Sequence, residues 1–125
     1  MFKMILTARK RPDISREAFI DYYDNRHVPF MHRLLGGGGA SVHRRNFVIA
    51  QAAGGAGEDF DVFTEVLYKD REFEAAVRLY ADPEILRQAR EDEAQFLIPE
   101  SIRAFVVEPH ETVFERVPET GNGAE

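Results

Sequence analysis

The strictest pattern in the sequence is an alternation of side chains over residues 60–68. The even-numbered positions carry five uncharged side chains, from Phe60 to Tyr68. The odd-numbered positions carry Asp61, Phe63, Glu65 and Leu67. A period of two places these sets on opposite faces of a β-strand. Because both sets contain large apolar side chains, the pattern predicts a strand in a sheet that is covered on both faces.

The remaining strands and helices follow from apolar runs and their boundaries. Apolar runs bounded by turn residues predict further strands at 2–8, 40–52 and 102–107, the last reaching as far as Phe114. Spacings of three and four predict one helix from Ser15 onward and a second helical region whose apolar stripe comprises Phe73, Ala76, Val77 and Tyr80. Asp82 and Pro83 then start a new helix that ends at Pro99. Glycine-rich breaks are expected at 36–39 and 52–59.

Pro29 limits the first helix. A proline disfavours the helical conformation of the residue before it and clashes with the carbonyl four positions back, which belongs to Asn25. We therefore expect the helix to stop or kink at His27, with residues 30–35 forming a further turn. A stop or kink there would open the helix beside His27, leave the Asn25 carbonyl unpaired and give the His27 ring a cleft to reach.

The order strand, helix, strand, strand, helix, strand is that of the α+β ferredoxin-like fold, βαββαβ. It predicts a four-stranded antiparallel sheet with its helices on one face, formed by residues 1–114, and a flexible tail at 115–125. Two helices cover only one face, while the strands are apolar on both. The simplest cover for the second face is an identical sheet, which predicts a homodimer closed into a dimeric α/β barrel.

Composition excludes several classes of function. The chain has 125 residues, a net charge of −6 and no cysteine. An acidic chain is a poor match for nucleic acid, and without cysteine there is no disulfide, thiolate nucleophile or Cys-ligated metal. No apolar run is long enough to span a membrane, so we expect a cytoplasmic protein with no membrane partner. No spacing typical of a metal site or a nucleotide-binding loop is present, so no metal or cofactor is expected.

His27 is the leading candidate for catalysis. It lies at a predicted helix C-terminus, where the helix dipole favours the protonated ring, and its ordinary pKa of about 6.5 suits proton transfer near neutral pH. The alternative is a histidine that only caps the last helical turn. Tyr22 and Tyr23 lie one turn earlier and could orient a phenolic or carbonyl substrate, or else pack in the core with a hydroxyl at its rim.

Three other residues are candidates for substrate binding. His43 lies on the second predicted strand and could face the helix-covered side of the sheet. Asn25 lies beside the expected cleft. Asp92, next to Glu93, borders an apolar helical face, where a carboxylate could pair with His27 or Arg26, although such residues are often simply solvated. His32 and His110 are expected at the surface.

The segment around His27 resembles the EthD family of the dimeric α/β-barrel superfamily, whose first helix typically reads F-x-x-Y-W-x-x-x-H-x-P. Phe19, Tyr22, His27 and Pro29 match this motif, and Tyr23 stands where the family more often has tryptophan. The run from Asp92 to Phe96 is similar to a second family signature. The resemblance covers roughly residues 2–110, and it implies the same fold and dimer as the pattern.

The resemblance also implies a range of activities. Family members and near relatives include proteins tied to degradation of ethers and aromatic compounds, polyketide cyclases, lactone isomerases and cofactor-free oxygenases. We therefore expect a cofactor-free isomerase, cyclase or oxygenase (in the last case an oxidoreductase) that acts on a small aromatic or polyketide-like compound by histidine acid/base chemistry. The alternative is a non-catalytic ligand-binding or accessory protein of a catabolic oxidising system.

Haem-binding catalysis is a third hypothesis, because some barrel relatives use a helical histidine for this purpose. A closed apolar cavity of a few hundred Å³ that reaches His27 would favour the enzyme or the ligand-binding protein over a purely structural role. A space filled by Phe and Tyr side chains would remove the basis for both.

Overall fold

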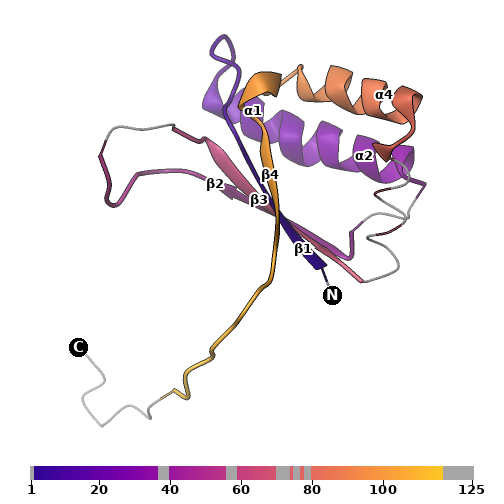
Figure 1. Ribbon diagram of the computed structural model, residues 1–125. Helices are drawn as coiled ribbons and strands as arrows, with labels where there is room; N and C mark the ends of the chain where they lie inside the picture. Colours follow the sequence, from indigo (N-terminus) through magenta and orange to yellow (C-terminus); the bar gives the residue numbers. More distant parts are fainter. Residues whose placement is uncertain are drawn as a thin grey trace.

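Four antiparallel strands form one sheet in the order β2-β3-β1-β4 (Figure 1). They are β1 (Phe2–Ala8), β2 (Val42–Phe47), β3 (Val62–Tyr68) and β4 (Arg103–Val107). The computed structural model describes residues 2–36, 40–55, 59–69, 74, 77 and 80–116. The first strand has its predicted bounds, whereas β2 and β3 are shorter than predicted. The expected extension of the last strand to Phe114 is wrong, because residues 108–116 leave the sheet as an exposed, extended segment.

The register of the sheet explains the alternation that dominates the sequence. β3 lies between β1 and β2, with Thr64 opposite Leu6 on one side and Arg45 on the other. Val62, Thr64, Val66 and Tyr68 are buried, whereas Phe63 on the opposite parity is 40% exposed. One face of β3 therefore belongs to the core, and its other apolar face is uncovered in the single chain.

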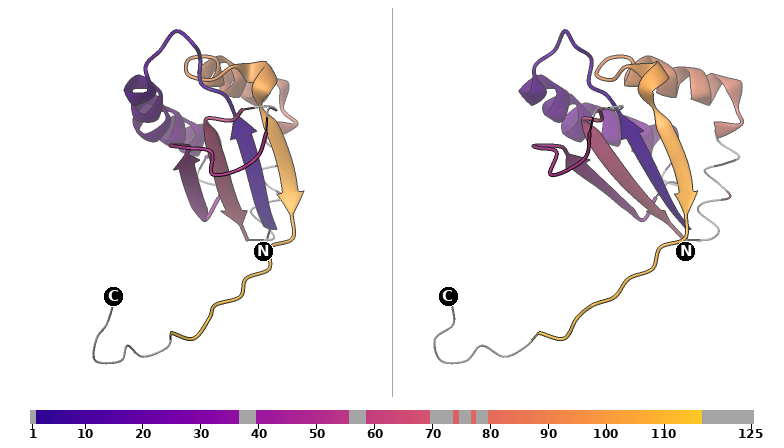
Figure 2. Two further views of the ribbon diagram at one scale, coloured as in Figure 1. Left: turned by 90° about the vertical axis from the view of Figure 1, so that its left-hand side faces the viewer. Right: turned by 60° about the vertical axis from the view of Figure 1, so that its left-hand side comes forward.

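The described helices all lie on one face of the sheet (Figures 1 and 2). They are α1 (Arg16–Tyr22), the π-helical turn η1 (Tyr23–His27), α2 (Val28–Leu34), α4 (Pro83–Glu93) and the short 3-10 turn η2 (Pro99–Ser101). Of the stripe predicted before Asp82, Phe73 and Ala76 lie outside the described residues, as does the end of the predicted tail beyond residue 116. Across the described residues, no helix is long and apolar enough to cross a membrane.

Of the two outcomes expected at His27, a stop or a kink of the first helix, the stop is wrong. The chain remains helical through Pro29, because residues 23–27 form a π turn in which the Val28 N–H donates to the Tyr23 carbonyl, five residues back. Such wide turns absorb local strain within helices and are frequent at functional sites. In an α-helix, which has 3.6 residues per turn, a residue eight positions along is rotated by about 80°. The wider turn reduces this drift, so that Phe19, Tyr23 and His27 are all buried.

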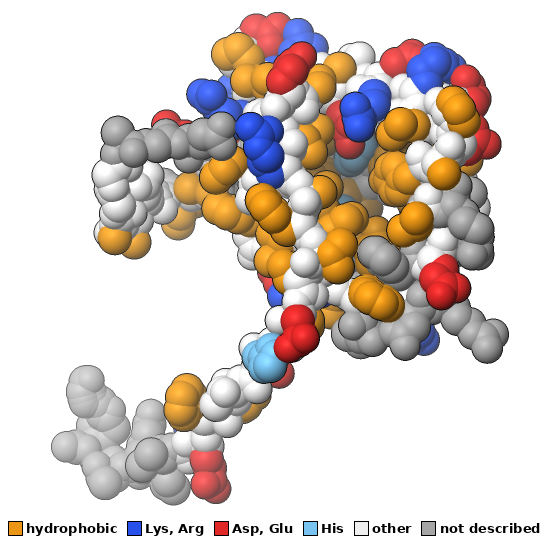
Figure 3. Space-filling model, viewed as in Figure 1, with side chains coloured by type: hydrophobic (Ala, Val, Ile, Leu, Met, Phe, Trp, Pro, Cys, Tyr) orange, Lys and Arg blue, Asp and Glu red, His pale blue; other side chains and the backbone are white. Residues whose placement is uncertain are grey.

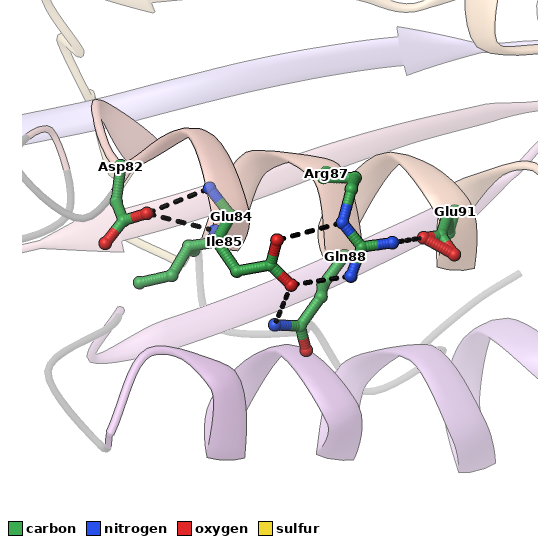
Figure 4. A network of polar contacts seen from close by, with 6 residues as sticks. All are labelled: Asp82, Glu84, Ile85, Arg87, Gln88 and Glu91. Atoms are coloured by element: carbon green, nitrogen blue, oxygen red, sulfur yellow. Dashed lines mark hydrogen bonds and ion pairs between the residues drawn. The ribbon is translucent and has the colours of Figure 1, made fainter.

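Side-chain caps fix where the helices begin. The Ser15 hydroxyl accepts a hydrogen bond from the Ala18 N–H at the start of α1. At the start of α4, the Asp82 carboxylate accepts from the backbone of Glu84 and Ile85 (Figure 4). On the exposed face of α4, Arg87 forms ion pairs with Glu84 and Glu91. These contacts hold α4 up to its last turn, which carries Asp92 and Glu93.

The core between helices and sheet is aromatic. Phe96, three residues after the end of α4, is fully buried, and its ring centroid lies 4.9 Å from that of Tyr23 and 6.1 Å from that of Phe19. Val62 of β3 and Leu97 complete this cluster. The sequence folds as the predicted α+β ferredoxin-like arrangement, and its core fixes α1, η1 and the end of α4 against one another.

Candidate functional site

A cavity of about 130 Å³ lies between the sheet and the helices. Most of its wall is apolar, and it comes from β1, β3 and α2. The polar side chains in the wall are those of Tyr23, His27, His32, His43, Thr64, Tyr68, Tyr80 and Glu93. The cavity is not filled by the aromatic core, and it is smaller than the few hundred Å³ expected.

A groove of about 710 Å³ adjoins this cavity. The groove and the cavity share wall residues, among them Leu6, Tyr80 and Glu93, and the groove continues along β4 and α4. On the surface it is a hollow framed by hydrophobic side chains, with histidine atoms visible at its floor (Figure 3). The combined volume of the cavity and the groove falls within the range of about 300–1,000 Å³ that is common for small-molecule sites.

His27 and Asp92 form a close pair at one wall of the cavity. His27 Nδ1 lies 2.6 Å from Asp92 Oδ2, and both side chains are largely buried. The sequence suggested His27 or Arg26 as the partner of Asp92, and the structure shows that the partner is His27. Because Nδ1 donates its proton to the carboxylate, the neutral ring keeps its lone pair on Nε2. This tautomer is the one required for a general base.

Tyr22 holds Asp92 from the other side. Its hydroxyl donates to Asp92 Oδ1 at 2.6 Å, and its ring stacks on Phe96. Burial and the hydrogen bond to Asp92 raise the pKa of Tyr22 to about 12. Tyr22 is not among the residues that line the cavity. It therefore orients Asp92 instead of facing the ligand space.

Tyr23 forms part of the cavity wall. Its hydroxyl shares a hydrogen bond of 2.6 Å with the Thr64 hydroxyl, and its ring meets that of His27 edge-on at 5.6 Å. Burial raises the pKa of Tyr23 to about 12. Thr64 was not singled out from the sequence. Its hydroxyl on the buried face of β3, among apolar neighbours, could have marked it as a candidate.

His43 faces the same cavity from β2. Its Nδ1 lies 2.8 Å from Arg45 Nη1, and Arg45 Nε donates to Asp24 at 2.7 Å. Burial, followed by the positive charge of Arg45, lowers the pKa of His43 to about 4. His43 is therefore neutral at physiological pH and accepts a hydrogen bond from Arg45 through Nδ1.

The environment of His27 differs from the sequence-based expectation. A histidine at a helix end would have been favoured in its protonated form by the helix dipole, but the helix continues past His27. Burial instead lowers the pKa of His27, while the hydrogen bond and charge of Asp92 oppose this effect. The neutral ring is therefore the form that the site favours near pH 7.

Asn25 does not join the site. It is exposed, its amide donates to Asp21 at 2.8 Å, and it is not among the residues that line the cavity. His110 lies on the exposed C-terminal segment, as expected, while His32 is exposed and borders the cavity.

The two lowered histidine pKa values predict how stability depends on pH. Below about pH 6.5 the unfolded chain binds a proton at His43, whereas the folded chain does so only near pH 4. The free energy of unfolding should therefore fall as pH decreases through this window, by about 3 kcal/mol for His43. His27 acts in the same direction. Urea denaturation of the wild type and His43→Gln at several pH values should show the wild type losing about 3 kcal/mol relative to the variant between pH 6.5 and pH 4; parallel curves would contradict the assignment.

The described residues hold no group of three His, Asp or Glu side chains placed to bind a metal ion. The cavity also tests the haem hypothesis. The cavity of about 130 Å³ is too small by itself for a porphyrin, so a haem held by His27 would also have to occupy the adjoining groove. We derive no step through haem.

The four-stranded antiparallel sheet, its one-sided helical cover and the enclosed histidine site define a small ferredoxin-like α+β protein with a cavity under its helices. The EthD domain model matches residues 11–100. The chain belongs to the EthD family, as the helix motif predicted. A search of curated proteins finds no match.

Solved structures with the same fold include two related to this family. An ethyl tert-butyl ether d (ethd) family protein from Bacillus halodurans is 18% identical, with 88% of this chain and 100% of that chain covered and a TM-score of 0.59. An EthD-like protein from Ralstonia eutropha is 23% identical, with coverage of 92% and 95% and a TM-score of 0.52. A dabb family protein with a ferredoxin-like fold from Mesorhizobium loti is 12% identical, with coverage of 88% and 97% and a TM-score of 0.55. These likenesses confirm the fold.

Proposed function

We propose that this EthD-family chain is a cofactor-independent enzyme that binds a small aromatic or polyketide-like molecule in the cavity and acts on it by proton transfer at His27. The observation that carries the proposal is that Asp92 Oδ2 lies 2.6 Å from His27 Nδ1 while the ring lines the cavity. An oriented, neutral imidazole in an apolar enclosure is the arrangement of a general base.

The residues around His27 take distinct parts in this proposal. Asp92 is a positioning residue for the ring, and Tyr22 positions Asp92 in turn. Tyr23 and His43 form the walls against which a flat ligand would lie. His27 Nε2 would remove an acidic C–H proton and return it to another carbon, which is an isomerisation, or leave a carbanion that closes a ring, which is a cyclisation. An oxygenase reaction would begin with the same proton removal.

Deuterium exchange tests this function without requiring that the product be identified. The wild type and His27→Gln are incubated in D₂O with a panel of 1,3-diketones, lactones and acylphenols, and deuterium at carbon is followed by NMR. We expect exchange above the buffer rate for at least one compound with the wild type, and its loss in His27→Gln. Equal exchange in the two proteins would contradict the role of His27.

The second candidate function is a non-catalytic ligand-binding or accessory protein of an oxidising system. The observation that favours it is the predominantly apolar wall shared by the cavity and the groove, which suits sequestration of a hydrophobic molecule. The same panel separates the two functions. Compounds that raise the melting temperature of both proteins but undergo no exchange in the wild type would support binding and contradict catalysis.

We also propose that the chain works as a homodimer that buries the sheet face opposite the helices. The left view of Figure 2 shows the four strands in front of the helices on this uncovered side. Phe63 and Phe105 on this face are 40% and 53% exposed in the single chain. Apolar side chains gathered on one face of a sheet are typical of an interface between identical subunits.

A further inference from the structure

Glu93 is a buried acidic residue that the mechanism above does not use. It occupies the last position of α4, next to Asp92, and lines both the cavity and the groove. Only 16% of its side chain is exposed. The neighbouring carboxylates have different surroundings: that of Asp92 is held by His27 and Tyr22, whereas that of Glu93 belongs to the wall of the ligand space.

One oxygen of the Glu93 carboxyl group lacks a hydrogen-bond partner among the described residues. Its Oε1 is buried and has no hydrogen bond within the described part of the chain. Arg90 is the cation that the described residues place close to Glu93; its Nε lies 3.7 Å from Oε1 and its side chain is mostly exposed. This separation is too long for a hydrogen bond. A buried acid without a hydrogen-bond partner is costly, and such a group in a native site calls for an explanation.

The surroundings of Glu93 favour its protonated form. Tyr68 on β3, Tyr80, Tyr23 and His27 on η1, and His43 on β2 line the same cavity as Glu93. Burial raises the pKa of Glu93 to about 7; Arg90 opposes this effect and the charge of Asp92 adds to it. Near neutral pH a large fraction of Glu93 is therefore a carboxylic acid with an O–H to donate.

We propose that Glu93 is a second catalytic residue, whose carboxylic acid donates a hydrogen bond to a ligand oxygen while His27 takes a proton from the adjacent carbon. The inference rests on the proposed function and narrows its substrate class to small enolisable carbonyl compounds with an apolar body. A neutral acid that lines the same cavity as a neutral imidazole divides the acid and base roles between two groups.

The proposed step balances without any further reactant. The C–H bond next to the carbonyl breaks, and its proton forms an N–H bond at His27 Nε2. The electron pair of that bond forms a C=C bond, and the carbonyl π electrons move onto the oxygen, where charge develops. The Glu93 O–H stabilises this oxygen. Reprotonation at carbon by His27 restores both groups.

A phenol binding assay tests Glu93 independently of turnover. The probe is 4-nitrophenol, a flat mimic of an enol whose neutral and ionised forms have different absorption bands. We expect Glu93→Leu to bind the probe about tenfold more weakly than the wild type, because one hydrogen bond to the oxygen is lost. Glu93→Gln, whose amide N–H still donates, should bind within about threefold of the wild type. Glu91→Leu, which removes an exposed carboxylate from the same helix, is the matched control and should bind like the wild type.

Several results would overturn the role of Glu93. These are equal affinity of the wild type and Glu93→Leu, the same loss in Glu91→Leu, or failure of the wild type to bind 4-nitrophenol at millimolar concentration. His27→Gln separates this inference from the proposed function. If His27 is a base, only the ionised fraction of the bound probe should fall in this variant; an unchanged fraction would count against His27 and leave the Glu93 comparison intact.

Carbon-13 NMR of the Glu93 carboxyl group provides a second readout, with the resonance identified by its absence in Glu93→Gln. We expect titration near pH 7 in the free protein and a displaced titration when the probe is bound. Titration near the ordinary value of about 4.3, unchanged by the probe, would overturn the proposal.

Discussion

Replacement of Asp92 by asparagine is expected to slow deuterium exchange by about 10²- to 10⁴-fold, the usual contribution of a positioned general base. The reason is a reversed tautomer. The Tyr22 hydroxyl donates to Oδ1 of residue 92, so an asparagine keeps its oxygen there and turns its NH₂ toward His27 Nδ1. The ring then carries its proton on Nε2 and has no lone pair facing the ligand. Nitrogen-15 shifts of the His27 ring report this tautomer directly.

Tyr22→Phe supplies a control within the same network. Without the Tyr22 hydroxyl, the amide introduced at position 92 is free, in the double variant, to turn its oxygen toward Nδ1 and restore the useful tautomer. Tyr22→Phe should therefore recover part of the exchange lost in Asp92→Asn, while lowering exchange only slightly on its own. Glu91→Gln controls for loss of an exposed carboxylate on α4. A rate for Asp92→Asn within about threefold of the wild type would refute the role of Asp92.

Phe105→Asp is expected to weaken the proposed homodimer by about 10²- to 10³-fold. Phe105 lies on β4 opposite Ile5, on the sheet face without helices, and is 53% exposed in the single chain. The substitution is therefore tolerated by the fold, but in the dimer it places an unpaired charge in a desolvated interface, at a cost of several kcal/mol. Sedimentation velocity over a range of protein concentrations measures the shift.

Val77→Asp is the matched control for the interface, because Val77 is also 53% exposed but borders the groove near α4. It should leave the dimer unchanged. A wild type that stays monomeric at all concentrations, or equal dissociation of the wild type and Phe105→Asp, would exclude this face as the interface.

The fold was predictable because its determinants are local. The alternation ending at Tyr68 fixes which face of β3 meets the helices, and Asp82 followed by Pro83 marks the start of α4 at the correct residue. The order of elements then restricts the topology. The length of β4 was not predictable, because the chain beyond Val107 remains apolar in places, with Val113 and Phe114, but has no partner strand within the described chain.

The site was predictable only in part. His27 was located by its motif, and Asp92 by its place beside an apolar helical face. Their contact joins residues 65 positions apart, so its geometry depends on how α4 packs on η1. The orientation of Glu93 into the cavity could not be derived from the sequence for the same reason. The helix-breaking rule for Pro29 failed because a π turn reroutes the backbone hydrogen bonds before the proline.

The π turn at Tyr23–His27 makes the number of residues in this segment as important as their identity. A π turn corresponds to one residue more than an α-helical turn would hold. Removing one residue between Phe19 and His27 would let the helix close into regular α-helical turns, and the imidazole would then follow Phe19 by seven positions, within about 20° of the same face. Adding one residue in regular α-helical geometry would instead rotate everything after the insertion by about 100°. The imidazole would then move away from Asp92, although every side chain of the site would still be present. Variation in length within this helix therefore has a different meaning from variation in the loops, because it resets which residue faces the ligand.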